Sequence, residues 1–276
     1  MKISLAFSTC PNDTFIFDAL VNHKIDTQDI DFDVTLADID VLNNNAARDQ
    51  FQVTKISTFA YADDIWNNYK ILNSGSALGV NNGPVLVASD YFPDSDIKNK
   101  SILIPGVKTT ANLLLSFFYP DAINKTVSLF SDIESQVLNS KADCGLLIHE
   151  GRFTYQSRGL KKIVDLGEKW QQTLNMPIPL GFIVATRSLP DDIVAKIDNL
   201  IYKSICYSFE HSESPMPYIL QNAREMSDDV MRSHIKLYVN DFTRSLGVSG
   251  KNAITFMYKT AYEKLLIDKM PSDIFI

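Results

Sequence analysis

Short apolar runs alternate with helix-like segments through most of residues 1–190, and this order most constrains the fold of the chain. Runs with the pattern of strands occupy residues 2–8, 31–37, 51–57, 101–105, 126–130 and 144–149. Continuous apolar strands between helices are typical of parallel sheets that are covered on both faces. After residue 190 only helical patterns follow, over residues 191–209, 218–225, 227–239 and 251–266. The order therefore predicts an α/β fold with C-terminal helices.

The alternating part falls into two blocks, which predict two α/β lobes around a cleft. A length of 276 residues corresponds to about two domains. Strand-like segments at residues 85–91 and 182–188 are the predicted crossovers between the lobes. We therefore expect residues 1–88 plus 187–276 to form a discontinuous first lobe, and residues 89–186 an inserted second lobe. A cleft between such lobes, at the carboxyl ends of strands, is where α/β proteins usually bind small molecules.

Charge and cysteine usage exclude several classes of protein. The 26 Lys and Arg against 33 Asp and Glu give a net charge of −7, and nucleic-acid binding through counterion release needs a basic surface. The three cysteines form no CxxC pair, which favours a reducing compartment and argues against a zinc site. No apolar run reaches the roughly 18 residues of a membrane span, and the N-terminus lacks the pattern of a signal peptide. We expect a soluble, cytoplasmic protein that does not bind nucleic acid.

Polar residues follow the ends of two predicted strands in the first block. Residues 8–14, STCPNDT, leave the first strand and open a helix, where hydroxyls, Asn12 and N–H groups could bind a carboxylate. Capping of that helix by Asn12 or Asp13 explains the same residues without a ligand. Lys55, Ile56 and Ser57 end the third strand. They are candidates for substrate binding, although a lysine in a strand pattern is more often found at a sheet edge.

In the second block, residues 106–111, GVKTTA, resemble an anion-binding turn. Glycine permits close approach of the backbone, and the hydroxyls and N–H groups of Thr109, Thr110 and Ala111 open the next helix. The spacing of a nucleotide P-loop is absent. Helix capping by Thr109 explains part of the pattern without a ligand.

His149 is the strongest single candidate, because an apolar strand delivers it, followed by Glu150, to a carboxyl end. An imidazole with an ordinary pKa near 6.5 suits general base catalysis around neutral pH, although a lone histidine at a strand end is more often structural. The other histidines, His23, His211 and His234, have polar neighbours and are predicted to face solvent. With no second ligand at a suitable spacing, we expect no metal site.

The nucleophile elbow, the dinucleotide-binding loop and the zinc-protease helix are all absent from the sequence. Redox cofactors and phosphoryl transfer are therefore disfavoured. Acid–base chemistry without a cofactor, or ligand binding alone, remains.

Eight segments, in this order and at compatible spacing, resemble the 1,4-dihydroxy-6-naphthoate synthase family of the futalosine route of menaquinone biosynthesis. The segments are CPNDTFIF (10–17), ADIDVLN (37–43), TKIS (54–57), GSALG (75–79), GP (83–84), PGVKTTA (105–111), IHEGRFTY (148–155) and PIPLG (177–181). The resemblance covers nearly the whole chain. Two positions depart from the family pattern: Thr9 stands where proline is frequent and Gly151 where serine is common.

The resemblance implies a periplasmic-binding-protein-like fold of type II. It also implies a lyase that, without metal or organic cofactor, converts cyclic dehypoxanthine futalosine to 1,4-dihydroxy-6-naphthoate and releases a three-carbon fragment. The family's catalytic base corresponds to His149. Its substrate-contacting stretches correspond to Lys55, Ile56 and Ser57, and to Thr110 and Ala111 with Thr109 adjacent. Neither departure removes one of these side chains.

Two other functions stay open at this point. A chorismate dehydratase of the same pathway is one, although the IHEGRFTY segment disfavours it. A solute-binding protein for a small carboxylate is the other, and such proteins normally carry a signal or lipid anchor. The sequence also leaves open a homodimer, further substrate contacts such as Asn12, and whether Glu150 or a backbone carbonyl orients the imidazole of His149.

Overall fold

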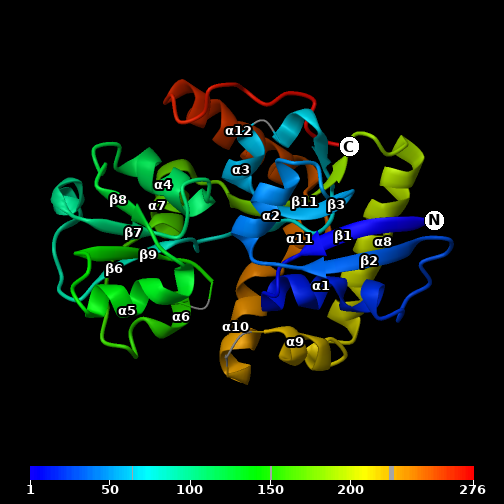
Figure 1. The fold of residues 1–276 in the computed structure, drawn as a ribbon, viewed down its shortest axis with the longest axis horizontal. Helices are drawn as coiled ribbons and strands as arrows, with labels where there is room; N and C mark the ends of the chain where they lie inside the picture. Colours follow the sequence, from blue (N-terminus) through cyan, green and yellow to red (C-terminus); the bar gives the residue numbers. More distant parts are fainter. Residues whose placement is uncertain (64, 150, 224–226) are drawn as a thin grey trace.

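The computed structural model describes residues 1–63, 65–149, 151–223 and 227–276. Its strands form two separate sheets, which lie in two lobes side by side (Figure 1). Both chain ends lie in the lobe that holds the N-terminal strands (Figure 1). The predicted arrangement of two α/β lobes thus describes the chain well.

The first sheet has the strand order β2-β1-β3-β11-β4, with β5 paired to β11. Its strands are β1 (Lys2–Phe7), β2 (Asp31–Leu36), β3 (Val53–Ser57), β4 (Tyr69–Ile71), β5 (Ala77–Gly79) and β11 (Ile178–Thr186). β1 runs parallel to β2 and β3, whereas β11 runs antiparallel to β3, β4 and β5.

The second sheet has the order β10-β6-β9-β7-β8. Its strands are β6 (Val85–Ala88), β7 (Ile102–Ile104), β8 (Lys125–Val127), β9 (Cys144–Leu147) and β10 (Lys161–Asp165). β7 is parallel to β8 and β9, and β6 is antiparallel to β9 and β10.

Helices cover both sheets. Those in the lobe of the first sheet are α1 (Pro11–Val21), α2 (Ile39–Ala46), α3 (Thr58–Ala62), α8 (Asp191–Glu210), α9 (Met216–Asn222), α10 (Asp228–Tyr238), α11 (Asp241–Arg244) and α12 (Gly247–Glu263). Those in the lobe of the second sheet are α4 (Thr110–Phe118), α5 (Ile133–Leu138), α6 (Gly151–Thr154) and α7 (Leu166–Leu174). Short 3-10 helices occupy Ile65–Asn67, Asp94–Asn99 and Phe130–Asp132.

The apolar residues of these elements form separate cores. One core joins β1 to α1, α8, α9 and α10 on one face of the first sheet. A second continues from α3 and α12 into the other lobe, where Trp170 and Leu114 are buried. A smaller core packs α5 against β6, β7 and β9. Gly145 of β9 is required there, because a Cβ at this position would lie 2.3 Å from Cγ2 of Ile133.

The pairing of two strands corrects the predicted boundaries and the predicted parallel arrangement. The boundary after residue 88 assigned β6 to the first lobe, but β6 pairs within the second sheet. The boundary after residue 186 assigned β11 to the second lobe, but β11 pairs within the first sheet. Both strands run against their neighbours, so each sheet is mixed. Their apolar composition could not reveal this, because buried strands of either direction have the same pattern.

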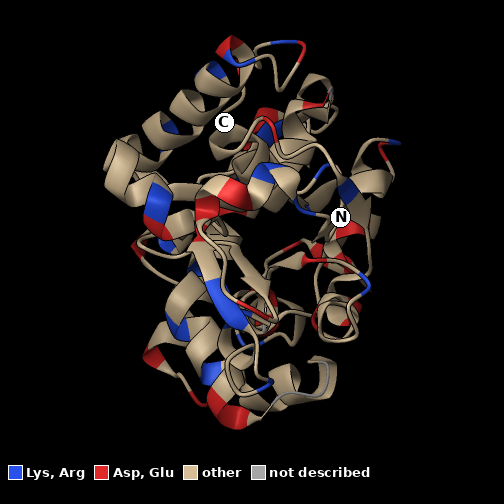
Figure 2. Ribbon diagram, turned by 90° about the vertical axis from the view of Figure 1, so that its left-hand side faces the viewer, with Lys and Arg blue, Asp and Glu red and all other residues tan. Residues whose placement is uncertain are grey.

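The parallel strands determine where polar residues meet. One cavity is lined by the last residues of β3 and by residues that follow β1 in the first sheet and β7 and β9 in the second. Positions of Lys and Arg are scattered among those of Asp and Glu over the ribbon (Figure 2). No helix among the described residues is long and apolar enough to cross a membrane.

Candidate active site

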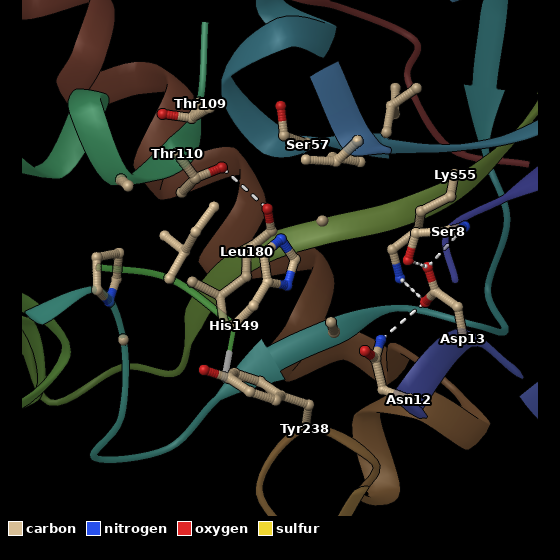
Figure 3. Close-up of a pocket in the computed structure, with 18 of the residues that line it drawn as sticks. Ser8, Asn12, Asp13, Lys55, Ser57, Thr109, Thr110, His149, Leu180 and Tyr238 are labelled. Carbon is tan, nitrogen blue, oxygen red and sulfur yellow. Dashed lines mark hydrogen bonds and ion pairs between the residues drawn. The ribbon is translucent and has the colours of Figure 1, made fainter. Parts of the chain in front are cut away.

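A cavity lies between the two lobes and is lined by residues of both (Figure 3). All seven residues singled out in the sequence line it: Lys55, Ile56, Ser57, Thr109, Thr110, Ala111 and His149. In Figure 3, Ser57 and the two threonines lie toward one side of the view, and Asn12 and Tyr238 toward the other. Residues from four strand ends therefore converge on one small space. Their individual roles remain predictions.

His149 occupies the turn that follows β9, with a backbone φ of 53°. This left-handed conformation is uncommon for residues other than glycine, and such strain is frequent at functional sites. Its Nδ1 atom lies 3.2 Å from Sγ of Cys10 at the start of α1. The ring of Phe130 packs beside the imidazole, with centroids 5.1 Å apart. The imidazole is thus held between a thiol of one lobe and an aromatic ring of the other.

Lys55 and Asp13 form a buried ion pair at the edge of the cavity, with Nζ and Oδ1 3.0 Å apart. Asp13 also accepts hydrogen bonds from Oγ of Ser8 at 2.6 Å and from Nδ2 of Asn12 at 2.8 Å. The carboxylate of Asp13 therefore compensates the charge of Lys55, and the lysine does not face the cavity as an unpaired cation. Asp13 lies in the first turn of α1, which begins at Pro11, and it orders the loop after β1 through Ser8 rather than capping the helix.

Ser57 connects the lobes through its hydroxyl. Its Oγ accepts a hydrogen bond from Nδ2 of Asn43 at 2.9 Å and donates one to the carbonyl of Lys108 at 3.1 Å. Its backbone N–H donates to Oδ1 of Asn43 at 2.9 Å. Asn43 thus fixes both polar groups of Ser57, because α2 packs against β3.

The N-terminus of α4 forms the opposite wall. Oγ1 of Thr109 accepts from the N–H of Asn112, so the predicted capping role is present. Oγ1 of Thr110 donates to the carbonyl of Leu180 in β11 at 2.9 Å. The N–H groups of Thr110 and Ala111 belong to the first turn, where intrahelical bonding leaves donors unused. Together with the helix dipole, they favour an anion at this wall.

The prediction that His234 faces solvent is wrong. It is 1% exposed, and it lines the cavity together with Tyr238, one turn later on α10. Burial, followed by the nearby His149 and Lys55, lowers the pKa of His234 to about 3. Burial raises the pKa of Tyr238 to about 12. Both side chains are therefore neutral at neutral pH.

A spacing in the sequence could have identified His234. Met231, His234 and Tyr238 stand at positions i, i+3 and i+7, the spacing of one helix face; Met231 is buried, and the other two line the cavity. The predicted alternative that Glu150 orients the imidazole lies outside the described residues. Within the described part of the chain, no group of three or more His, Cys, Asp or Glu side chains is placed to hold a metal ion.

Comparison with known sequences gives a consistent result. The model of a family described as menaquinone biosynthesis matches residues 3–263. A protein of Streptomyces coelicolor named 1,4-dihydroxy-6-naphtoate synthase is 36% identical over 98% of this chain and 96% of its own length. A Thermus thermophilus protein of the same name is 35% identical over 99% of both chains.

Comparison with solved structures gives the fold. A crystal structure of an Archaeoglobus fulgidus protein superposes with a TM-score of 0.91 at 32% identity, covering 96% of this chain and 98% of that one. The alkanesulfonate-binding protein of Xanthomonas axonopodis pv. citri superposes with a TM-score of 0.76 at 9% identity, covering 98% and 95%. The predicted periplasmic-binding-protein-like fold is confirmed.

Proposed function

The chain belongs to the menaquinone biosynthesis family, and we propose that it converts cyclic dehypoxanthine futalosine to 1,4-dihydroxy-6-naphthoate with His149 as general base. The identity to two synthases of that name, over nearly the whole chain, supports the reaction. The assignment of His149 as the base is supported by its position: it follows a buried strand and lines a cavity shared by both lobes.

In this mechanism, neutral His149 removes a proton from the sugar-derived part of the substrate. Carbon–carbon cleavage of the retro-aldol type and elimination then release the three-carbon fragment and leave an aromatic bicyclic ring. Aromatisation supplies driving force, so the protein has to orient the substrate and transfer protons. A hydrogen bond from Nδ1–H of His149 to Sγ of Cys10 would leave the lone pair on Nε2, as a base acting through Nε2 requires.

The substrate carboxylate is proposed to bind at the N-terminus of α4, where the N–H groups of Thr110 and Ala111 lie beside Ser57, whose hydroxyl proton is donated to Lys108. Lys55 contributes a polar contact whose charge is shared with Asp13. The hydrogen bonds from Ser57 to Lys108 and from Thr110 to Leu180 connect the lobes across the cavity. A closed arrangement of this kind would keep water from the reactive intermediate.

The place and assembly of the enzyme are further parts of the proposal. We infer a cytoplasmic location, which is supported by the biosynthetic role named for the relatives. A homodimer stays a prediction from the sequence.

Incubation of the purified protein with cyclic dehypoxanthine futalosine tests the function. The proposal expects the naphthoate and the three-carbon fragment to appear in equal amounts. Substrate recovered unchanged but tightly bound would identify a solute-binding protein instead. Chorismate, supplied in a parallel incubation, should remain unchanged, and its dehydration would identify the other pathway enzyme.

A further inference from the structure

The imidazole of His234 is buried beside the proposed base without using its own hydrogen-bonding capacity. Neither ring nitrogen has a hydrogen-bond partner among the described residues. Burying such a group without a partner is destabilising, and most buried polar side chains in proteins do have partners. Because His234 lines the cavity, a bound molecule can supply the missing partner.

Aromatic rings from both lobes surround the imidazole of His234. Its ring is nearly parallel to that of His149, at an angle of 13°, with centroids 6.3 Å apart. Tyr238, the next inward residue of α10, packs on it at 4.7 Å, and Phe153 of the other lobe lies at 6.2 Å. These rings shield the imidazole from solvent. His149 and His234 both line the cavity with ring centroids 6.3 Å apart, so a molecule bound at His149 lies close to His234.

The protonation of His234 determines which groups it can bind. Burial and the neighbouring His149 and Lys55 keep it neutral, because they lower its pKa to about 3. A neutral imidazole offers one N–H donor and one lone-pair acceptor. A hydroxyl group, which also donates and accepts, complements this pair.

We propose that His234 is a substrate-binding residue that hydrogen-bonds a hydroxyl of the sugar-derived part of the substrate and holds it beside His149. This inference rests on the function proposed above. It assigns to His234 the recognition of the reacting end of the substrate, whereas the α4 wall recognises the carboxylate. His149 remains the only proton acceptor in this scheme.

The test separates a substrate contact from a structural residue. In His234→Phe the buried nitrogens are lost, so we expect kcat/KM to fall by at least about tenfold while the melting temperature stays equal or rises. His234→Asn keeps one donor and one acceptor and should recover part of the activity. His211→Asn, at an exposed position at the end of α8, is the matched control and should change neither quantity.

Binding of the intact substrate, measured by calorimetry, provides a second readout. We expect His149→Asn to bind the substrate and the double variant with His234→Phe to bind it at least about tenfold more weakly. A His234→Phe enzyme with unchanged kcat/KM, or equal binding by the two variants, would overturn the inference. Failure of the wild-type protein to form naphthoate would instead refute the proposed function.

Discussion

Sγ of Cys10 and Nδ1 of His149 lie 3.2 Å apart, although the two residues are 139 positions apart in the chain. Cys10 precedes α1, which follows the first strand of one sheet, and His149 follows β9 of the other. The contact therefore spans the cavity between the lobes and brings a sulfur atom against the nitrogen of the proposed base. Cys10 can therefore orient the imidazole, in addition to the two partners predicted from the sequence, Glu150 or a backbone carbonyl.

Replacement of Cys10 tests this orienting contact. We expect Cys10→Ala to lower kcat by about two- to tenfold, as loss of one hydrogen bond of roughly 0.5–1.5 kcal/mol implies, with KM nearly unchanged. Cys10→Ser should retain more activity, because its hydroxyl can accept the same hydrogen bond. Steady-state kinetics measures both parameters. Equal kcat for wild type and Cys10→Ala would show that Cys10 does not orient His149 for catalysis.

The converging site residues were predictable because of a simple rule of α/β folds. Thr109 and His149 follow β7 and β9, whose parallel carboxyl ends meet at one edge of the second sheet, and Ser57 ends β3 of the first sheet. The sheet to which β6 and β11 each belong was not predictable in the same way. It is decided by strands distant in sequence: β6 pairs with β9, which contains Leu146, and β11 pairs with β3, which contains Ile56.

The electrostatic state of the site also depends on contacts distant in sequence. Lys55 looked like an available cation, but Asp13, which precedes it by 42 positions, neutralises it. Likewise His234 has charged and polar neighbours along the chain, and its burial involves tertiary contacts with the rings of His149 and Phe153 in the other lobe. Local sequence therefore identified the strand ends, whereas tertiary contacts determined charge and burial.

The Asp13–Lys55 pair should be important for stability. Its side chains are 2% and 7% exposed, and removing one partner of a buried pair leaves an uncompensated charge that destabilises by about 3–5 kcal/mol. We expect urea unfolding of Asp13→Asn to show a loss in this range. The double variant Asp13→Asn with Lys55→Met should recover much of it, since both charges are gone; equal losses for the single and double variants would contradict this.

Thr110 offers a test of the α4 wall. Thr110→Val preserves the shape of the side chain but removes the hydroxyl that donates to Leu180. We expect KM to rise about tenfold, because loss of the hydrogen bond to Leu180 displaces the N–H groups proposed to bind the carboxylate, with kcat changed less. An unchanged KM would show that the hydrogen bond from Thr110 to Leu180 does not position the substrate-binding wall.

The buried neutral state of His234 predicts a loss of stability in acid. Burial, His149 and Lys55 lower its pKa from 6.5 to about 3 in the folded protein. Below pH 6.5 the unfolded chain therefore binds a proton that the folded chain does not, so the free energy of unfolding falls as the pH falls toward about 3. The slope approaches about 1.4 kcal/mol per pH unit for one proton.

Comparison with His234→Phe isolates this contribution. Urea unfolding at pH 7 and pH 5 should show a smaller loss for the variant than for the wild type, because the variant has no proton to bind at this position. Parallel losses in the two proteins would show that other groups cause the acid sensitivity.

The most direct measurement is the single-turnover rate of His149→Asn with cyclic dehypoxanthine futalosine, at protein concentrations that bind all of the substrate. If His149 is the general base, the rate of naphthoate formation falls by about 10²–10⁴-fold relative to the wild type, while the bound substrate is recovered intact. A rate near that of the wild type would contradict the central claim.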